Sequence, residues 1–173
     1  RRALDRQEFK LNLQSRIDLQ PGQITLDAEL LPWMNPTRGA VPPAQFIPIA
    51  EKSGLIIRIG AWALREACTQ GRAWADACSP AKTVTVNISR VELQNDHFLD
   101  GLFETLNATG LNPGSLELDI TESALMNYPA RTASILKALK QRGVKISVDN
   151  FGIGSSNLTS LQRLPLDSLK IDR

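Results

Sequence analysis

The sequence has few residues of the types that disulfide bonds and soft metal ions need. It holds one histidine and two cysteines, Cys68 and Cys78, among 173 residues. The cysteines fall in a predicted helix and in the segment after it, which is no disulfide framework and favours a reducing compartment. We therefore expect a cytoplasmic domain. His97 falls at a helix start, and we expect it to be a surface residue rather than a metal ligand.

An excess of charge of one sign is also absent. Lys and Arg number 20 against 18 Asp and Glu, which gives a net charge of +2. That balance argues against nucleic acid or a membrane surface as the partner. No apolar run approaches the length of a membrane span, so we expect no membrane segment in this chain. Hydrophobic residues make up 42% of the sequence, which is enough for an ordinary core.

The hydrophobic pattern predicts an α/β fold. Phe9–Gln14 and Ile24–Leu31 predict a hairpin across the Pro21-Gly22 turn, and the proline-rich stretch 33–43 predicts a loop. Beyond that loop, helices and strands alternate, which predicts parallel strands and right-handed crossovers. The expected helices are Ala44–Lys52, Ile57–Asp76, Asp96–Thr109, Pro129–Gln141 and Leu158–Arg163, and the expected strands are Thr83–Asn87, Leu116–Ile120, Val144–Val148 and Ser168–Ile171.

This pattern favours a closed barrel over an open sheet, but it supplies only about six strands. An eight-stranded α/β barrel typically needs about 250 residues. We therefore expect residues 1–173 to be a partial domain whose last strand–helix units are missing.

Polar residues stand at the carboxyl ends of nearly all the predicted strands. Oxygen ligands without a His or Cys partner suit Mg²⁺, Mn²⁺ or Ca²⁺, and a lysine among them would complement a phosphate or hold an attacking water. The pattern indicates metal-assisted phosphate chemistry. For the loop after Asp149 alone, a turn with an Asx cap is the alternative. The residues are Gln14, Asn87, Asp119, Asp149 with Asn150, and Lys170.

Five sequence blocks occur together and in order: VPPAQFIPIAE, VNIS, DITES, DNFGIG and LKID. With them the chain resembles the EAL domain family, the cyclic di-GMP phosphodiesterases, over essentially its whole length. The resemblance implies a TIM-like (β/α)8 barrel with an antiparallel first strand, which agrees with the hairpin. It also implies hydrolysis of cyclic di-GMP to linear pGpG by two Mg²⁺ or Mn²⁺ ions and a metal-bound water.

The resemblance also implies roles for single residues. The metal ligands would be Asn87, Asp119 and Asp149 with Asn150, the catalytic lysine Lys170, and the residue that anchors the loop after Asn150 would be Glu122. The nucleotide would be contacted by Gln14, Leu30, Asn87, Asp149 and Lys170.

The sequence departs from the family pattern at several of these places. Counting back from Trp33, the EAL triplet is Ala28-Glu29-Leu30, so Ala28 replaces the metal-binding Glu. Sliding the strand by one residue would recover Glu29 but would turn every side chain of the strand to the other face. Asn150 replaces the second acid of the DDFG motif. Because two cations need several carboxylates, we expect Mg²⁺ or Mn²⁺ to be absent or weakly bound and catalysis to be impaired.

Three functions remain open on this basis. The domain would be a cyclic di-GMP receptor or regulatory module, or a protein–protein interaction domain that binds no nucleotide. It would be an active phosphodiesterase if Glu29 substitutes for the missing Glu and the C-terminal part is present. The expected partners are cyclic di-GMP, other domains of the same chain such as a GGDEF domain, and a second copy bound through the 150–160 loop.

Overall fold

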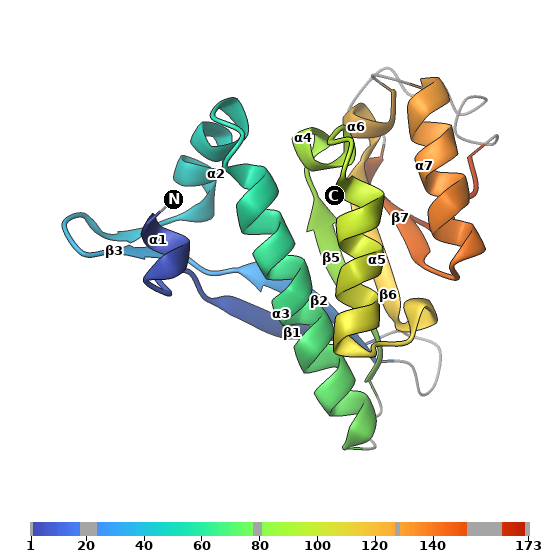
Figure 1. Cartoon of the computed structure of the whole chain (residues 1–173), viewed down its shortest axis with the longest axis horizontal. Coiled ribbons are helices and arrows are strands. Elements are labelled where there is room, and N and C mark those ends of the chain that lie inside the picture. Colours follow the sequence, from blue (N-terminus) through green and yellow to red (C-terminus); the bar gives the residue numbers. More distant parts are fainter. Residues whose placement is uncertain (1, 18–23, 78–80, 127–128, 152–163, 172–173) are drawn as a thin grey trace.

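The structure is a computed structural model, and it describes residues 2–17, 24–77, 81–126, 129–151 and 164–171. Its main sheet has six strands in the order β1-β2-β5-β6-β7-β8 (Figure 1). β1 runs antiparallel to β2, and the other neighbours are parallel. The predicted TIM-like α/β fold with an antiparallel first strand is confirmed. The strands are β1 (Leu11–Ile17), β2 (Ile24–Leu30), β5 (Ala81–Ile88), β6 (Leu116–Thr121), β7 (Lys145–Phe151) and β8 (Ser168–Ile171).

Helices cover one face of this sheet, with α3 and α5 lying side by side across it in Figure 1. Among the described helices, none is both long and apolar enough to cross a membrane. The helices are α1 (Arg2–Asp5), α2 (Pro43–Lys52), α3 (Ile56–Asp76), α4 (Arg90–Leu93), α5 (Phe98–Thr109), α6 (Glu122–Met126) and α7 (Pro129–Gln141), with a 3-10 turn at Pro113–Ser115.

The structure adds elements that the sequence pattern did not predict. The proline-rich stretch contains a small hairpin of β3 (Trp33–Asn35) and β4 (Gly39–Val41). Its turn closes because the Asn35 side chain accepts hydrogen bonds from two backbone amides and Gly39 adopts a φ of +72°. α4 and α6 were also missed, since each is a single turn directly after a strand. The predicted helix Leu158–Arg163 lies outside the described residues.

The two faces of the sheet differ in chemistry because successive side chains of a strand point to opposite sides. Val86, Leu118 and Ile146 lie in one core cluster with helix residues such as Leu64 and Leu136. The residues between them in the strands are mostly polar and belong to the other face, which is the interior face of a TIM-like barrel. The polar positions of the central strands are Thr83, Thr85, Asn87, Glu117, Asp119, Thr121, Ser147 and Asp149.

Close packing of α3 on β5 fixes the helix layer. Gly71 of α3 is buried, and a Cβ placed on it would lie 2.6 Å from Cγ2 of Val84. A side chain at this position would force Val84 or the helix to shift. Cys68 lies nearby with no exposed surface, and its burial raises the pKa of the thiol to about 12, so it is a core residue rather than a nucleophile.

A second cluster of aromatic residues joins the start of β1 to α2 and α3. Phe9 stacks on Trp33 at a centroid distance of 5.9 Å and contacts the rings of Phe46 and Trp62. The indole Nε1 of Trp33 donates to a carboxylate oxygen of Glu8 at 2.8 Å. This cluster holds α2 and the small hairpin beside the carboxyl ends of β2 and β5.

Candidate active site

Parallel pairing places three polar residues level with one another on the barrel face. Asn87 of β5 pairs with Asp119 of β6, and Asp119 pairs with Ser147 of β7. Asn87 is exposed, whereas Asp119 is 6% exposed. The Ser147 hydroxyl donates to Oδ1 of Asp119 at 2.7 Å. Sequence reasoning missed Ser147, although its place two residues before Asp149 already assigns it to this face.

Lys170 of β8 reaches the same carboxylate. Its ammonium group donates to Oδ2 of Asp119 and forms an ion pair with it. The lysine side chain is 23% exposed, so the pair lies in a mostly dry environment where an uncompensated carboxylate would be costly. The ammonium and the Ser147 hydroxyl therefore hold the Asp119 carboxylate in place and neutralise it. This contact joins two of the residues that the sequence proposed for the site.

Other predicted site residues lie at the rim. Asp149 is half-buried and pairs with Thr121, two residues nearer the carboxyl end of β6 than Asp119. Glu122 is buried and begins α6 directly after β6. Asn150 follows Asp149 in β7, and its side chain lies outside the described part of the chain. Asn87, Asp119 and Asp149 thus all face the carboxyl ends of the parallel strands.

The register of β2 changes the interpretation of the EAL triplet. Ala28 pairs with Val86, and both belong to the core cluster under α3. Ala28 therefore lies on the helix face and not on the face of Asn87. The next residue, Glu29, pairs through its backbone with Asn12, and its side chain lies outside the described part of the chain.

That Ala28 occupies the place of the metal-binding Glu stays a prediction, and the register places Ala28 on the helix face. Counting back from Trp33 assumes a fixed spacing between the strand and that tryptophan. The position of β2 is set instead by the packing of Ala28 between Leu13 and Val86 on the apolar face.

β1 also differs from the simple strand-end prediction. Because β1 is antiparallel to β2, its carboxyl end lies at the opposite edge of the sheet from the other strand ends. Gln14 pairs with Asp27, two positions deeper than Glu29. Gln14 is therefore not level with Asn87, and Asn12 is the β1 residue opposite Glu29. Leu30 pairs with Leu11 through its backbone, and the side chain of Leu30 lies outside the described part of the chain.

The donors of the site fit a hard divalent cation. Among the described side chains, no three His, Cys, Asp or Glu residues gather closely enough to hold a metal. Asn87, Asp119 and Asp149 nevertheless supply an amide and two carboxylates, the ligand types that Mg²⁺ and Mn²⁺ prefer.

Buried Glu92 is a further acidic group near this edge that sequence reasoning did not single out. It is 7% exposed and forms a capping box with Ser89 at the start of α4, directly after the strand that carries Asn87. Burial raises its pKa to about 7; hydrogen bonds from Ser89 act in the opposite direction, and Glu51 adds to the rise. The signal in the sequence was the S-x-x-E spacing of a capping box.

Oxygen donors and a lysine at the carboxyl ends of parallel strands are typical of barrel domains that handle phosphate groups with a metal ion. The chain belongs to the EAL domain family, whose family model, described as EAL domain, matches residues 1–173.

Two relatives from Pseudomonas aeruginosa carry related functional names. The bifunctional diguanylate cyclase/cyclic di-GMP phosphodiesterase MucR is 39% identical over 173 residues, which cover 100% of this chain and 25% of MucR. The cyclic di-GMP phosphodiesterase NbdA is 37% identical over 100% of this chain and 22% of NbdA. The chain thus spans about a quarter or less of the length of these relatives.

Solved structures give the same fold. The PaMucR phosphodiesterase in complex with c-di-GMP superposes with a TM-score of 0.92 at 38% identity, over 99% of this chain and 69% of that one. The FimX EAL domain from Pseudomonas aeruginosa bound to c-di-GMP has a TM-score of 0.88 at 25% identity, over 99% and 68%.

Proposed function

We propose that this domain binds cyclic di-GMP at the carboxyl-terminal edge of its strands through a divalent cation, and that it acts chiefly as a receptor or regulatory module. Glu29, Asn87, Asp119 and Asp149 would hold the cation, Mg²⁺ or Mn²⁺. The cation would supply positive charge to a phosphate of the dinucleotide. Lys170, on moving from Asp119, would donate to a phosphate oxygen.

The register of β2 is the observation that carries this proposal. Ala28 packs on the helix face beside Val86, so the acidic position of β2 falls on the face of Asn87 and Asp119. An acidic residue there removes the main reason to expect a site without metal. The complexes of the related PaMucR phosphodiesterase and FimX EAL domain with c-di-GMP support the choice of ligand.

Impaired hydrolysis follows from Asn150. An asparagine offers an oxygen but no charge, so a second cation beside the first would lack the negative charge that offsets cation–cation repulsion. Binding needs one cation, whereas the family reaction uses two. Phosphodiesterase activity is the second candidate function, and the acidic position at Glu29 favours it over a domain that binds only protein.

Neighbouring domains are the proposed output. The relative MucR is a bifunctional diguanylate cyclase/cyclic di-GMP phosphodiesterase. A GGDEF domain in the same chain would be a natural target for a cyclic di-GMP signal. The proposed contact between two copies involves the 150–160 loop, of which residues 152–160 lie outside the described part of the chain.

The test combines calorimetry with product analysis on the purified protein. Cyclic di-GMP is titrated in Mg²⁺ and in EDTA, and linear pGpG is measured after incubation with Mn²⁺. We expect Mg²⁺-dependent binding with little product, and Asn150→Asp should increase product formation at least tenfold. Glu104→Gln is a matched control because Glu104 is an exposed carboxylate on α5.

Two results would contradict the proposal. Failure of the protein to bind cyclic di-GMP in Mg²⁺ would leave only the protein-binding function. Rapid hydrolysis by the unmodified protein would replace the receptor function with that of an active phosphodiesterase.

A further inference from the structure

A cavity of about 420 Å³ opens between α2, α3 and the ends of β2 and β5. One wall is apolar and is formed by Ile47, Ile56 and Ile59. Asn87 and Asp119 also line it, so the cavity is continuous with the candidate metal site. Its size is in the range of sites that take small molecules or nucleobases. A ligand held by its phosphate at the strand ends could place an attached ring in this cavity.

Glu92 and Ser89 bring polar groups to the same cavity. The backbone amide of Ser89 donates to Oε2 of Glu92 at 3.0 Å, and the Ser89 hydroxyl also contacts Oε2. Within the described residues, the hydrogen bonds of this carboxylate all go to Ser89 through Oε2. Oε1 lies against Gly60 of α3, where a Cβ would be only 1.6 Å away. The glycine therefore makes room for the second oxygen.

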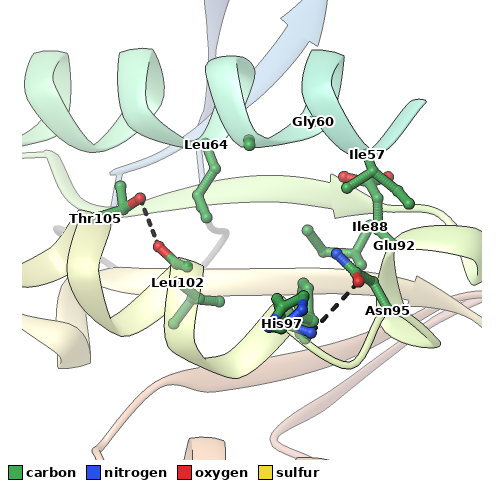
Figure 2. Close-up of a pocket in the computed structure, with 12 residues that line it drawn as sticks. Ile57, Gly60, Leu64, Ile88, Glu92, Asn95, His97, Leu102 and Thr105 are labelled. Carbon is green, nitrogen blue, oxygen red and sulfur yellow. Dashed lines mark hydrogen bonds between the residues drawn. The ribbon is translucent and has the colours of Figure 1, made fainter. Parts of the chain in front are cut away.

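Glu92 also borders a smaller cavity of about 70 Å³ between α3, α4 and α5. Figure 2 shows this cavity, with Glu92 of α4 below the turn of α3 that carries Ile57 and Gly60. Glu92 and Gly60 line both cavities, so their contact stands between the two. The carboxylate is fixed by its cap on one side and is next to open volume on the other.

We infer that Glu92 is a specificity-determining residue that reads the base of the bound dinucleotide, accepting hydrogen bonds from guanine N–H groups at Oε1. This inference rests on the proposed function, because it needs cyclic di-GMP at the strand ends. Guanine presents two adjacent donors, N1–H and the 2-amino group, on one edge. A carboxylate offers acceptors and no donor when it is ionised. The apolar wall of Ile47, Ile56 and Ile59 would contact the flat face of the ring.

The protonation of Glu92 supports this role. A buried carboxyl whose pKa lies at about 7 is close to half ionised in neutral solution. Donors on a bound base would favour its ionised form, which makes the hydrogen bonds charge-assisted and stronger than neutral ones. A base that lacks those donors would leave the carboxylate with its desolvation cost uncompensated.

The test compares cyclic di-GMP with its inosine analogue, which lacks the 2-amino group, by calorimetry in Mg²⁺. The unmodified protein should bind cyclic di-GMP about tenfold to a hundredfold more tightly, the discrimination expected when a charged acceptor loses a donor. Glu92→Gln should reduce that ratio to a few-fold, while a glutamine can still accept the amide hydrogen of Ser89. Gly60→Ala should also reduce the ratio, because the added methyl displaces Oε1 without removing the charge. Glu104→Gln is the control.

The outcomes distinguish binding of the dinucleotide by the domain from recognition of its base by Glu92. If the unmodified protein binds neither dinucleotide, the proposed function fails and this inference fails with it. If it binds cyclic di-GMP but both variants keep the full discrimination while remaining folded by circular dichroism, only the role of Glu92 is refuted. A smaller ratio in both variants, with unchanged discrimination in Glu104→Gln, supports the role.

Discussion

The pKa of Glu92 makes the stability of the domain dependent on pH in a direction that can be measured. The carboxyl is buried, and its pKa rises from the ordinary 4.5 to about 7. The folded state therefore binds this proton more tightly than the unfolded state. Between pH 4.5 and 7 the folded protein holds more protons, so its free energy of unfolding falls as the pH rises. This loss of stability is absent below about pH 4.5 and complete above about pH 7.

The size of the effect follows from the difference in pKa. A rise from 4.5 to about 7 corresponds to about 3 kcal/mol of lost stability at high pH. Glu92→Gln removes the ionisation and keeps a hydrogen-bond acceptor for Ser89. The free energy of unfolding of the variant, relative to that of the unmodified protein, should therefore be about 2–3 kcal/mol higher at pH 8 than at pH 5. Any effect of the substitution that does not depend on pH cancels in this comparison.

Urea denaturation followed by circular dichroism at pH 5, 6, 7 and 8 gives the required free energies. Glu104→Gln, an exposed change on α5, should show a difference from the unmodified protein that is nearly constant across this range. A constant difference for Glu92→Gln as well would show that Glu92 titrates at its ordinary pKa, and would refute the buried, desolvated carboxyl described here.

Three further predictions concern the packing and the site. Gly71→Ala should lower the free energy of unfolding by about 1–3 kcal/mol because the new methyl meets Val84 at 2.6 Å. The control Gly101→Ala, which has open space around it, should raise the free energy of unfolding by up to about 1 kcal/mol. Equal urea midpoints for the two variants would contradict this. Lys170→Met should cost roughly 1–3 kcal/mol and should increase the thermal shift on adding Mg²⁺, because a cation then replaces the ammonium beside Asp119. The control Lys140→Met breaks a more exposed ion pair and should show the same Mg²⁺ shift as the unmodified protein; equal shifts in both variants would argue against a cation beside Asp119. Ala28→Glu should destabilise the protein by roughly 3 kcal/mol or more because position 28 faces the core; a stable variant with stronger metal binding would show that position 28 faces the barrel interior.

Hydrophobic periodicity predicted most of the fold because the central strands carry apolar residues at alternate positions. Leu116–Ile120 and Val144–Val148 were placed within a few residues of β6 and β7. The elements that escaped prediction are short. The β3–β4 hairpin and α4 are held by turn and cap hydrogen bonds rather than by an apolar pattern, so hydrophobic periodicity carries no signal for them.

The site could be predicted as a set of residues but not as a geometry. Asp119 and Lys170 were named from the sequence, and their ion pair was not. The face of Ala28 could not be decided from motif spacing, because a shift of one residue inverts a strand and the deciding features, its pairing with Val86 and its place in the core cluster, are tertiary. For the same reason Glu92 emerged only with the fold, since α3 and Gly60 bury it.

The most direct measurement is a calorimetric titration of cyclic di-GMP into the unmodified protein and into Glu29→Gln, each in Mg²⁺ and in EDTA. Glu29 follows Ala28 in β2 and is a ligand in the proposed cation site, so the variant should keep the fold and lose a charge from that site. The predicted result is binding of the unmodified protein in Mg²⁺ that weakens at least tenfold in EDTA, and a variant that is weak in both. Equal affinity for all four combinations would contradict a cation held by Glu29 at this edge of the sheet.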